Sequence, residues 1–157
     1  IVYHGSRDLA KGLGWTLSLA RKTPDLNYLI PLDRGTADFI GPPNTTIRPM
    51  RWEEGLFDAV KGARMTIAPS LWSAPCEGGL IKSILTSRLC AVVENPGAFS
   101  GEIPDNVVLK LPQDLDQARQ TITQAFAKNW RPDEKARQKW VNTFKIYHQG
   151  IFERLIS

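Results

Sequence analysis

The sequence predicts an α/β fold in which helices cover both faces of a parallel sheet of about six strands. Short apolar runs alternate along the chain with stretches that have the length and spacing of amphipathic helices. The apolar runs are hydrophobic at successive positions, which is typical of strands buried on both faces of a sheet. Because crossovers between parallel strands are right-handed, this order gives a doubly wound, Rossmann-like sheet.

The strands and helices are expected in alternation from the first residue. The predicted strands cover residues 1–4, 27–32, 45–49, 65–68, 90–94 and 107–111. The predicted helices cover residues 13–22, 52–61, 80–88, 114–128 and 133–156, the last being a long C-terminal helix.

Periodicity supports the elements of the first half. Leu13, Leu17 and Ala20 recur at helical spacing after the first strand. The second strand leads into a loop at 33–44, which carries glycines and a Pro-Pro pair, and the strand at 45–49 is the weakest of the set. The next helix is expected to turn three apolar residues, Leu56, Phe57 and Val60, toward the core.

The second half follows the same pattern. The run at 90–94 is the strongest strand of the chain, and the run at 107–111 is a shorter one. Asp114 can cap the helix that follows it, because aspartate accepts hydrogen bonds from free amides at a helix start. The C-terminal helix has apolar residues at spacings of three and four: Trp140, Phe144, Tyr147, Ile151 and Leu155.

Length and composition indicate one ordinary globular domain. The 157 residues are 42% hydrophobic and 23% charged, with a formal net charge of +4. This mild basicity suits phosphate-bearing ligands or peripheral contact with the inner face of a membrane, whereas the scattered basic residues do not predict nucleic-acid binding. Cys76 and Cys90 show no disulfide or metal-site spacing, which favours buried free thiols and a cytoplasmic location.

No apolar run reaches the roughly 20 residues that cross a bilayer, and no signal peptide is visible. The chain starts at Ile1, within a predicted strand and without a methionine. We therefore expect it to be one domain of a longer protein.

Three loops should share one edge of the sheet, since ligands of doubly wound sheets bind beyond the carboxyl ends of the strands. The first, residues 5–12, places Gly5, Ser6, Arg7 and Lys11 between a strand and a helix. Glycine permits close approach of the backbone, and helix amides with basic side chains attract phosphate. The alternative interpretation is a solvated surface turn.

The second loop, residues 69–79, ends with Glu77, Gly78 and Gly79 at a helix start. Exposed backbone amides therefore lie together with a carboxylate that can accept hydrogen bonds from hydroxyl groups. Glu77 is equally well explained as an acidic residue of the first helical turn that opposes the helix dipole. Lys82 in the helix is either part of the site or a solvent-facing residue. Trp72 either stacks on a ligand or serves packing.

The third loop, residues 95–102, contributes two glycines and Glu102, which could accept a hydrogen bond from a sugar hydroxyl. His4, at the end of the first strand, either faces the ligand or belongs to the core, and the core interpretation is favoured. The sequence shows no Ser-His-Asp set and no pair of carboxylates suited to glycoside hydrolysis, which argues against a self-contained hydrolase. No catalytic residue is assigned.

Taken together, the loops resemble the C-terminal domain of the retaining glycosyltransferases of the GT-B fold known as group one. The resemblance rests on Val2-Tyr3-His4-Gly5 with Lys11-Gly12, on residues 65–70, on residues 77–93 and on residues 95–103. It covers nearly the whole chain. It implies that Lys11 binds the diphosphate of a nucleotide-sugar donor, that the turn around residues 77–79 touches the sugar and phosphate, and that Glu102 lies near the nucleoside.

Two further expectations follow from the resemblance. The acceptor is held by an N-terminal domain that this chain lacks, and no metal or other cofactor is required. The chain departs from the family pattern because the arginine position falls on Ser6, with Arg7 one place later, and the two positions of the Glu-x7-Glu motif fall on Ala74 and Lys82.

The sequence thus predicts the donor-binding half of a hexosyltransferase that acts on an acceptor hydroxyl and is inactive as an isolated domain. The substitutions at Ala74 and Lys82 leave open a catalytically degenerate domain that binds a sugar nucleotide or scaffolds an assembly. A nucleotide-sugar epimerase on the same architecture is also open.

Overall fold

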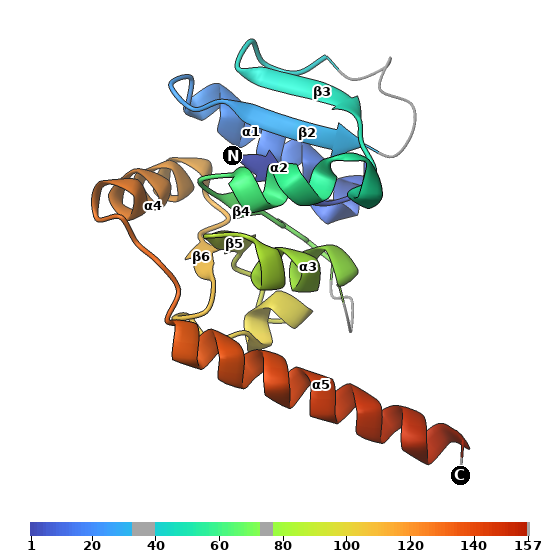
Figure 1. Cartoon of the computed structure of the whole chain (residues 1–157). Helices are drawn as coiled ribbons and strands as arrows, with labels where there is room; N and C mark the ends of the chain where they lie inside the picture. Colours follow the sequence, from blue (N-terminus) through green and yellow to red (C-terminus); the bar gives the residue numbers. More distant parts are fainter. Residues whose placement is uncertain (33–39, 73–76, 157) are drawn as a thin grey trace.

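A parallel sheet organises the protein. The computed structural model describes residues 1–32, 40–72 and 77–156, with side chains described for residues 1–32, 40–72, 77–145 and 149. Within this part, six strands form one sheet in the order β3-β2-β1-β4-β5-β6, and every pairing is parallel. The predicted α/β, Rossmann-like sheet is confirmed (Figure 1). Most of the predicted loop at 33–44 lies outside the described residues, as do Ala74 and Cys76.

Each predicted strand and helix has a counterpart, with bounds that differ by a few residues. The strands are β1 (Val2–Tyr3), β2 (Tyr28–Leu32), β3 (Thr45–Pro49), β4 (Thr66–Ile67), β5 (Cys90–Val93) and β6 (Leu109–Leu111). The α-helices are α1 (Leu13–Lys22), α2 (Leu56–Gly62), α3 (Gly78–Thr86), α4 (Leu115–Ala127) and α5 (Glu134–Ile156). Three 3-10 helices, η1 (Leu9–Lys11), η2 (Trp52–Glu54) and η3 (Phe99–Glu102), lie in the connections.

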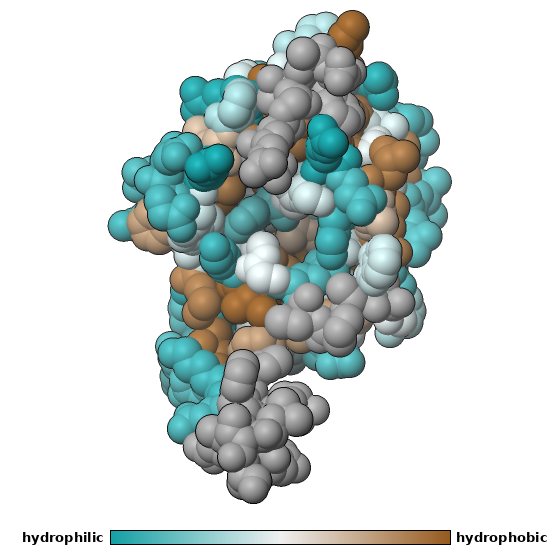
Figure 2. Space-filling model, turned by 90° about the vertical axis from the view of Figure 1, so that its right-hand side faces the viewer, coloured by the Kyte–Doolittle hydropathy of each residue, from teal (hydrophilic) through white to brown (hydrophobic). Residues whose placement is uncertain are grey.

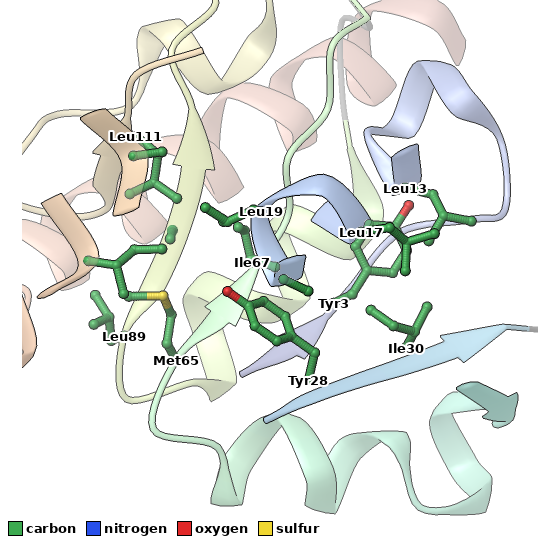
Figure 3. Close-up of a cluster of buried hydrophobic side chains, with 14 of the residues drawn as sticks. Tyr3, Leu13, Leu17, Leu19, Tyr28, Ile30, Met65, Ile67, Leu89 and Leu111 are labelled. Carbon is green, nitrogen blue, oxygen red and sulfur yellow. The ribbon is translucent and has the colours of Figure 1, made fainter. Parts of the chain in front are cut away.

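The apolar runs are continuous because the sheet is buried on both faces. Alternate residues of a strand point to opposite faces. On one face, strand residues such as Tyr3 and Ile67 pack in one cluster with residues of α1 and α4 (Figure 3). On the other face, Val2 packs with α2, and Val92 packs with α3. Cys90 lies on this second face, where burial raises the pKa of its thiol to about 12, in agreement with a buried free cysteine.

The helix predicted at 52–61 is interrupted at Gly55. This glycine has a φ of 104°, a conformation that side chains with a Cβ rarely adopt, and it separates η2 from α2. Leu56 and Val60 are buried as predicted, but Phe57 is 40% exposed, so its predicted place in the core is wrong. Leu56 and Val60, one helical turn apart, occupy the face toward the sheet, and Phe57 packs edge-on against Trp52 instead.

Aromatic side chains attach α5 to the end of the sheet that carries β5 and β6. Phe99 of η3, Trp140 and Phe144 form a cluster with ring centroids 5.4 to 6.2 Å apart. The predicted apolar spacing of the helix is confirmed for Trp140 and Phe144, and Figure 1 shows α5 running past the body of the domain. Among the described residues, no helix is long and apolar enough to span a membrane.

Candidate ligand-binding site

The order of the strands places a crevice beside β1. From β1 the chain adds β2 and β3 on one side and then crosses to β4 on the other. Where the direction reverses, the loops that follow the strands separate and leave room for a ligand at the carboxyl ends. A cavity of about 490 Å³ lies there. Sites for small molecules typically enclose about 300–1,000 Å³. Figure 2 views the molecule from the side to which the strands point, where hydrophilic side chains predominate.

Four connections contribute to the walls of this cavity. Its lining residues are His4, Gly5, Ser6, Lys11, Pro31, Met50, Arg51, Trp52, Glu53, Leu56, Glu77, Gly78, Gly79 and Leu80. They come from the loop after β1, the end of β2, the segment from β3 to the first residue of α2, and the start of α3 with the residue before it.

A buried tyrosine holds the loop after β1. The hydroxyl of Tyr3 lies 2.6 Å from the carbonyl of Ser6 and 3.2 Å from that of Lys11, so it fixes the loop at both ends. Burial is the main cause that raises the pKa of this hydroxyl above its usual value, with smaller contributions from Asp8 and Glu77. The hydroxyl therefore stays protonated and donates. A Cβ added at Gly5 would lie 2.5 Å from the same oxygen, which explains the glycine.

Lys11 and Glu77 bring the first two loops together. The ammonium of Lys11 lies 3.5 Å from Glu77 Oε1, and the glutamate side chain is only 7% exposed while the lysine side chain is 30% exposed. Glu77 immediately precedes α3 and makes no capping hydrogen bond with its side chain. The carboxylate thus orients a cation that lines the cavity, and it lies at the start of α3, where the first amides have no acceptor within the helix.

The backbone joins the same two loops. The amide of Leu71 donates to the carbonyl of Ala10 at 2.9 Å. Gly12, with a φ of 78°, lies so close to Pro69 that an added Cβ would come within 2.0 Å of the proline carbonyl oxygen. A glycine is therefore required at this contact, both for its φ and for the close approach.

Stacked side chains form another part of the cavity wall. The His4 ring lies parallel to the Trp52 ring with centroids 5.3 Å apart, and Lys82 Nζ lies 4.7 Å from the centre of the Trp52 ring. His4 Nδ1 is 2.8 Å from Ser83 Oγ. Burial and, to a smaller extent, the charge of Lys82 lower the pKa of His4 to about 4. The imidazole is therefore neutral near pH 7.

The structure brings together six of the predicted site residues. Gly5, Ser6, Lys11, Glu77, Gly78 and Gly79 all line the cavity. Arg7 is exposed and does not line the cavity. Lys82 does not line it either, but its ammonium lies over the ring of Trp52, which does. The third loop follows β5 at the same edge of the sheet, but Glu102 is exposed and does not line this cavity. The roles of all nine residues remain predictions.

Sequence reasoning missed the segment between β3 and α2. Met50, Arg51, Trp52 and Glu53 line the cavity because β3 ends at the same edge as the other parallel strands. The rule that located the first three loops applies to this one too. The segment was not recognised as part of the site because Trp52 was predicted to begin a regular helix. Trp72, by contrast, is 55% exposed, so it is not a packing residue within the described part.

Metal-binding groups are not gathered in the described ranges. Within residues 1–32, 40–72 and 77–156, no three side chains of His, Cys, Asp or Glu are arranged to hold a metal ion. The residues that line the cavity supply two cations, two carboxylates, a hydroxyl group, an indole and an imidazole that is neutral near pH 7.

Two solved structures share this architecture. A sucrose-phosphate synthase from Thermosynechococcus elongatus superposes with a TM-score of 0.65 at 14% identity, over 95% of this chain and 45% of the synthase. A UDP-forming α,α-trehalose-phosphate synthase from Burkholderia xenovorans superposes with a TM-score of 0.58 at 12% identity, over 80% of this chain and 36% of the synthase. The fold is that of one part of these two synthases.

Both are glycosyltransferases of the GT-B fold, so the fold implied by the sequence resemblance is confirmed. The chain spans less than half the length of either synthase. No protein-family model and no curated protein sequence matches the chain.

Proposed function

We propose that this chain is the donor-binding half of a glycosyltransferase, and that its cavity binds the diphosphate and sugar of a nucleotide-sugar donor. The observation that carries the proposal is the position of Lys11, which lines the cavity and whose ammonium lies 3.5 Å from Glu77 at the start of α3. The fold shared with two sugar-phosphate synthases supports it.

The predicted site residues have complementary tasks in this proposal, whether they line the cavity or lie outside its lining. Lys11 and the amides of Gly78 and Gly79 offset the negative charge of the diphosphate, which is both ligand and leaving group. Glu77 holds Lys11 and accepts a hydrogen bond from the sugar, Arg7 adds charge from the rim, and Glu102 approaches the nucleoside. A hexosyl group is transferred to an acceptor hydroxyl held by a second domain of a longer chain, with no metal.

Titration of the chain with UDP-, GDP- and dTDP-linked sugars tests the proposal. We expect one nucleotide class to bind weakly, since half of the donor site of a two-domain enzyme is present. Lys11→Ala should reduce that binding at least tenfold, because a lost charge-assisted contact to phosphate is worth about 1.5–3 kcal/mol. Calorimetry or chemical-shift changes give the affinity.

Lys22→Ala is the matched control. It removes the same charge, but Lys22 pairs with exposed Asp116 between α1 and α4, away from the cavity. Its affinity should equal that of the unmodified chain. Absence of binding for every nucleotide sugar would overturn the donor site and favour a scaffold domain. Equal losses of affinity in Lys11→Ala and Lys22→Ala would show that Lys11 contributes only through the net charge of the chain.

A further inference from the structure

We infer that His4 is a ligand-binding residue, and that its Nε2 atom accepts a hydrogen bond from a hydroxyl group of the nucleotide-sugar donor. This inference rests on the proposed function and adds a residue that the sequence assigned to the core. Three observations support it: the tautomer of the ring, the position of Nε2 and the rigidity of the ring.

The hydrogen bonds of Ser83 determine the tautomer. Ser83 Oγ lies 2.9 Å from the carbonyl oxygen of Gly79 and 2.8 Å from His4 Nδ1. A carbonyl oxygen can only accept, and the hydroxyl has one proton to give. Both contacts are satisfied together only if Ser83 donates to Gly79 and His4 donates from Nδ1. In the neutral ring, Nε2 then carries a lone pair and no proton.

The second nitrogen lies near Gly79, another residue of the cavity lining. His4 and Gly79 both line the cavity, and a Cβ added at Gly79 would lie 3.6 Å from Nε2. The hydrogen bonds among the described side chains involve only Nδ1 of this ring. Burial beside the positive charge of Lys82 keeps the imidazole neutral, because it lowers the pKa of His4 to about 4. Nε2 is thus an acceptor with no bond to the described residues.

The ring is fixed before any ligand arrives. The stack on Trp52 and the bond to Ser83 set its plane and rotation. Because the ring does not have to reorient, little side-chain conformational entropy is lost when a ligand binds to it.

The cavity lining offers both donors and acceptors to a sugar nucleotide. Lys11, Arg51 and the amides at the start of α3 suit phosphate oxygens. The carboxylates of the lining are Glu77, which pairs with Lys11 through Oε1, and Glu53, which is exposed. Unlike these carboxylates, His4 Nε2 is an uncharged acceptor on a ring held by two contacts, which suits a hydroxyl group that donates its proton.

Nitrogen NMR of the ligand-free chain tests the tautomer directly. The chain has two histidines, His4 and His148, so the signals that disappear in His4→Gln assign the ring. We expect a protonated Nδ1 and an unprotonated Nε2 at pH 7. A proton on Nε2 would overturn the inference without touching the proposed function, since Lys11 and its phosphate contact would be unaffected.

Addition of UDP and of UDP-glucose, or of GDP and GDP-mannose if the panel selects guanine, then tests the contact. We expect the Nε2 resonance to move as its lone pair accepts a hydrogen bond. A shift with the bare diphosphate assigns the contact to the ribose, whereas a shift only with the sugar-linked form assigns it to the hexose. Binding that depends on Lys11 but leaves Nε2 unmoved would overturn the inference alone.

Two variants distinguish the role of Nδ1 from the role of Nε2 in His4. The amide of His4→Asn can still donate to Ser83 Oγ but offers no acceptor at the position of Nε2, whereas the longer His4→Gln can place an oxygen there. We expect His4→Asn to weaken binding about 3- to 10-fold, the value of one hydrogen bond, and His4→Gln to recover part of that loss. Equal losses, or a greater loss with Gln, would show that the ring acts only through packing.

Discussion

At the scale of single residues, the hydroxyl of Tyr3 is the contact on which the first loop depends. It donates toward the carbonyl oxygens of Ser6 and Lys11 from a fully buried ring. Tyr3→Phe leaves both carbonyl oxygens without this donor. We expect a loss of about 1–2 kcal/mol in the free energy of unfolding, together with weaker nucleotide-sugar binding because Lys11 is no longer held in place. Urea denaturation and calorimetry measure the two effects.

Tyr28→Phe provides a matched comparison. Tyr28 is also buried, and its hydroxyl lies 2.7 Å from Thr23 Oγ1, at the amino end of β2 and outside the cavity lining. We expect similar destabilisation with unchanged affinity for the nucleotide sugar. If Tyr3→Phe loses stability but keeps its affinity, the tyrosine does not position the loop for binding.

His4 makes stability depend on pH. Burial and Lys82 lower the pKa of His4 from 6.5 to about 4. Between these values the unfolded chain binds a proton that the folded chain does not. The contribution of His4 is therefore complete above pH 6.5 and is lost as the pH falls toward 4. We expect a loss on the order of 2 kcal/mol over this interval.

The pH dependence is measured as the difference between the unmodified chain and His4→Gln, because carboxylates titrate in the same interval in both proteins. Lys82→Met should shrink this difference, since it removes the positive charge that opposes protonation of His4. Parallel stability curves for the unmodified chain and His4→Gln would contradict the prediction.

At the scale of elements, the contact of Gly12 with Pro69 holds the first two loops together. Gly12→Ala forces a side chain into positive φ and places its Cβ 2.0 Å from a carbonyl oxygen. Because neither strain can relax without moving a backbone segment, we expect a loss of about 2–4 kcal/mol in the free energy of unfolding. The loops should separate, and nucleotide-sugar binding should be lost with them.

Gly62 at the end of α2 gives the opposite expectation. A Cβ added there meets no atom within 4 Å. Gly62→Ala should therefore stabilise the protein by up to about 1 kcal/mol through the higher helix propensity of alanine. Thermal unfolding of the two variants compares them directly, and a Gly12→Ala protein as stable as the unmodified chain would contradict the close packing.

The elements could be predicted because their causes are local. Strand and helix positions follow from apolar spacing and from turn residues, and Asp114 caps α4 through its side chain as predicted. Phe57 was placed wrongly because its direction depends on the break at Gly55 and on how α2 then meets the sheet. Neither is encoded in the spacing of apolar residues.

At the scale of the whole molecule, the topology made the site partly predictable. Parallel strands carry their following loops to one edge, so the residues after β1 and before α3 meet there. The sequence did not identify the segment after β3, nor did it place His4 against Trp52 and Ser83. Those contacts join residues 48 and 79 positions apart and depend on how neighbouring connections pack.

The attachment of α5 provides a test of the molecule as a whole. Trp140 packs on Phe99 and on the buried cluster around β5 and β6, so it links the C-terminal helix to the domain. Trp140→Ala should reduce the free energy of unfolding by about 1–3 kcal/mol, less than for a fully buried tryptophan because the ring is only partly covered.

Hydrogen exchange locates the effect of that change. The amides of α5 should lose protection in Trp140→Ala, whereas those of β1 and β2 should keep theirs, because the cluster around α1 and α4 does not include Trp140. Gln138→Ala on the same helix removes only an exposed bond to Asn142 and should leave the exchange pattern unchanged. Uniform loss of protection across the sheet in Trp140→Ala would instead mean that α5 and the sheet unfold as one cooperative unit.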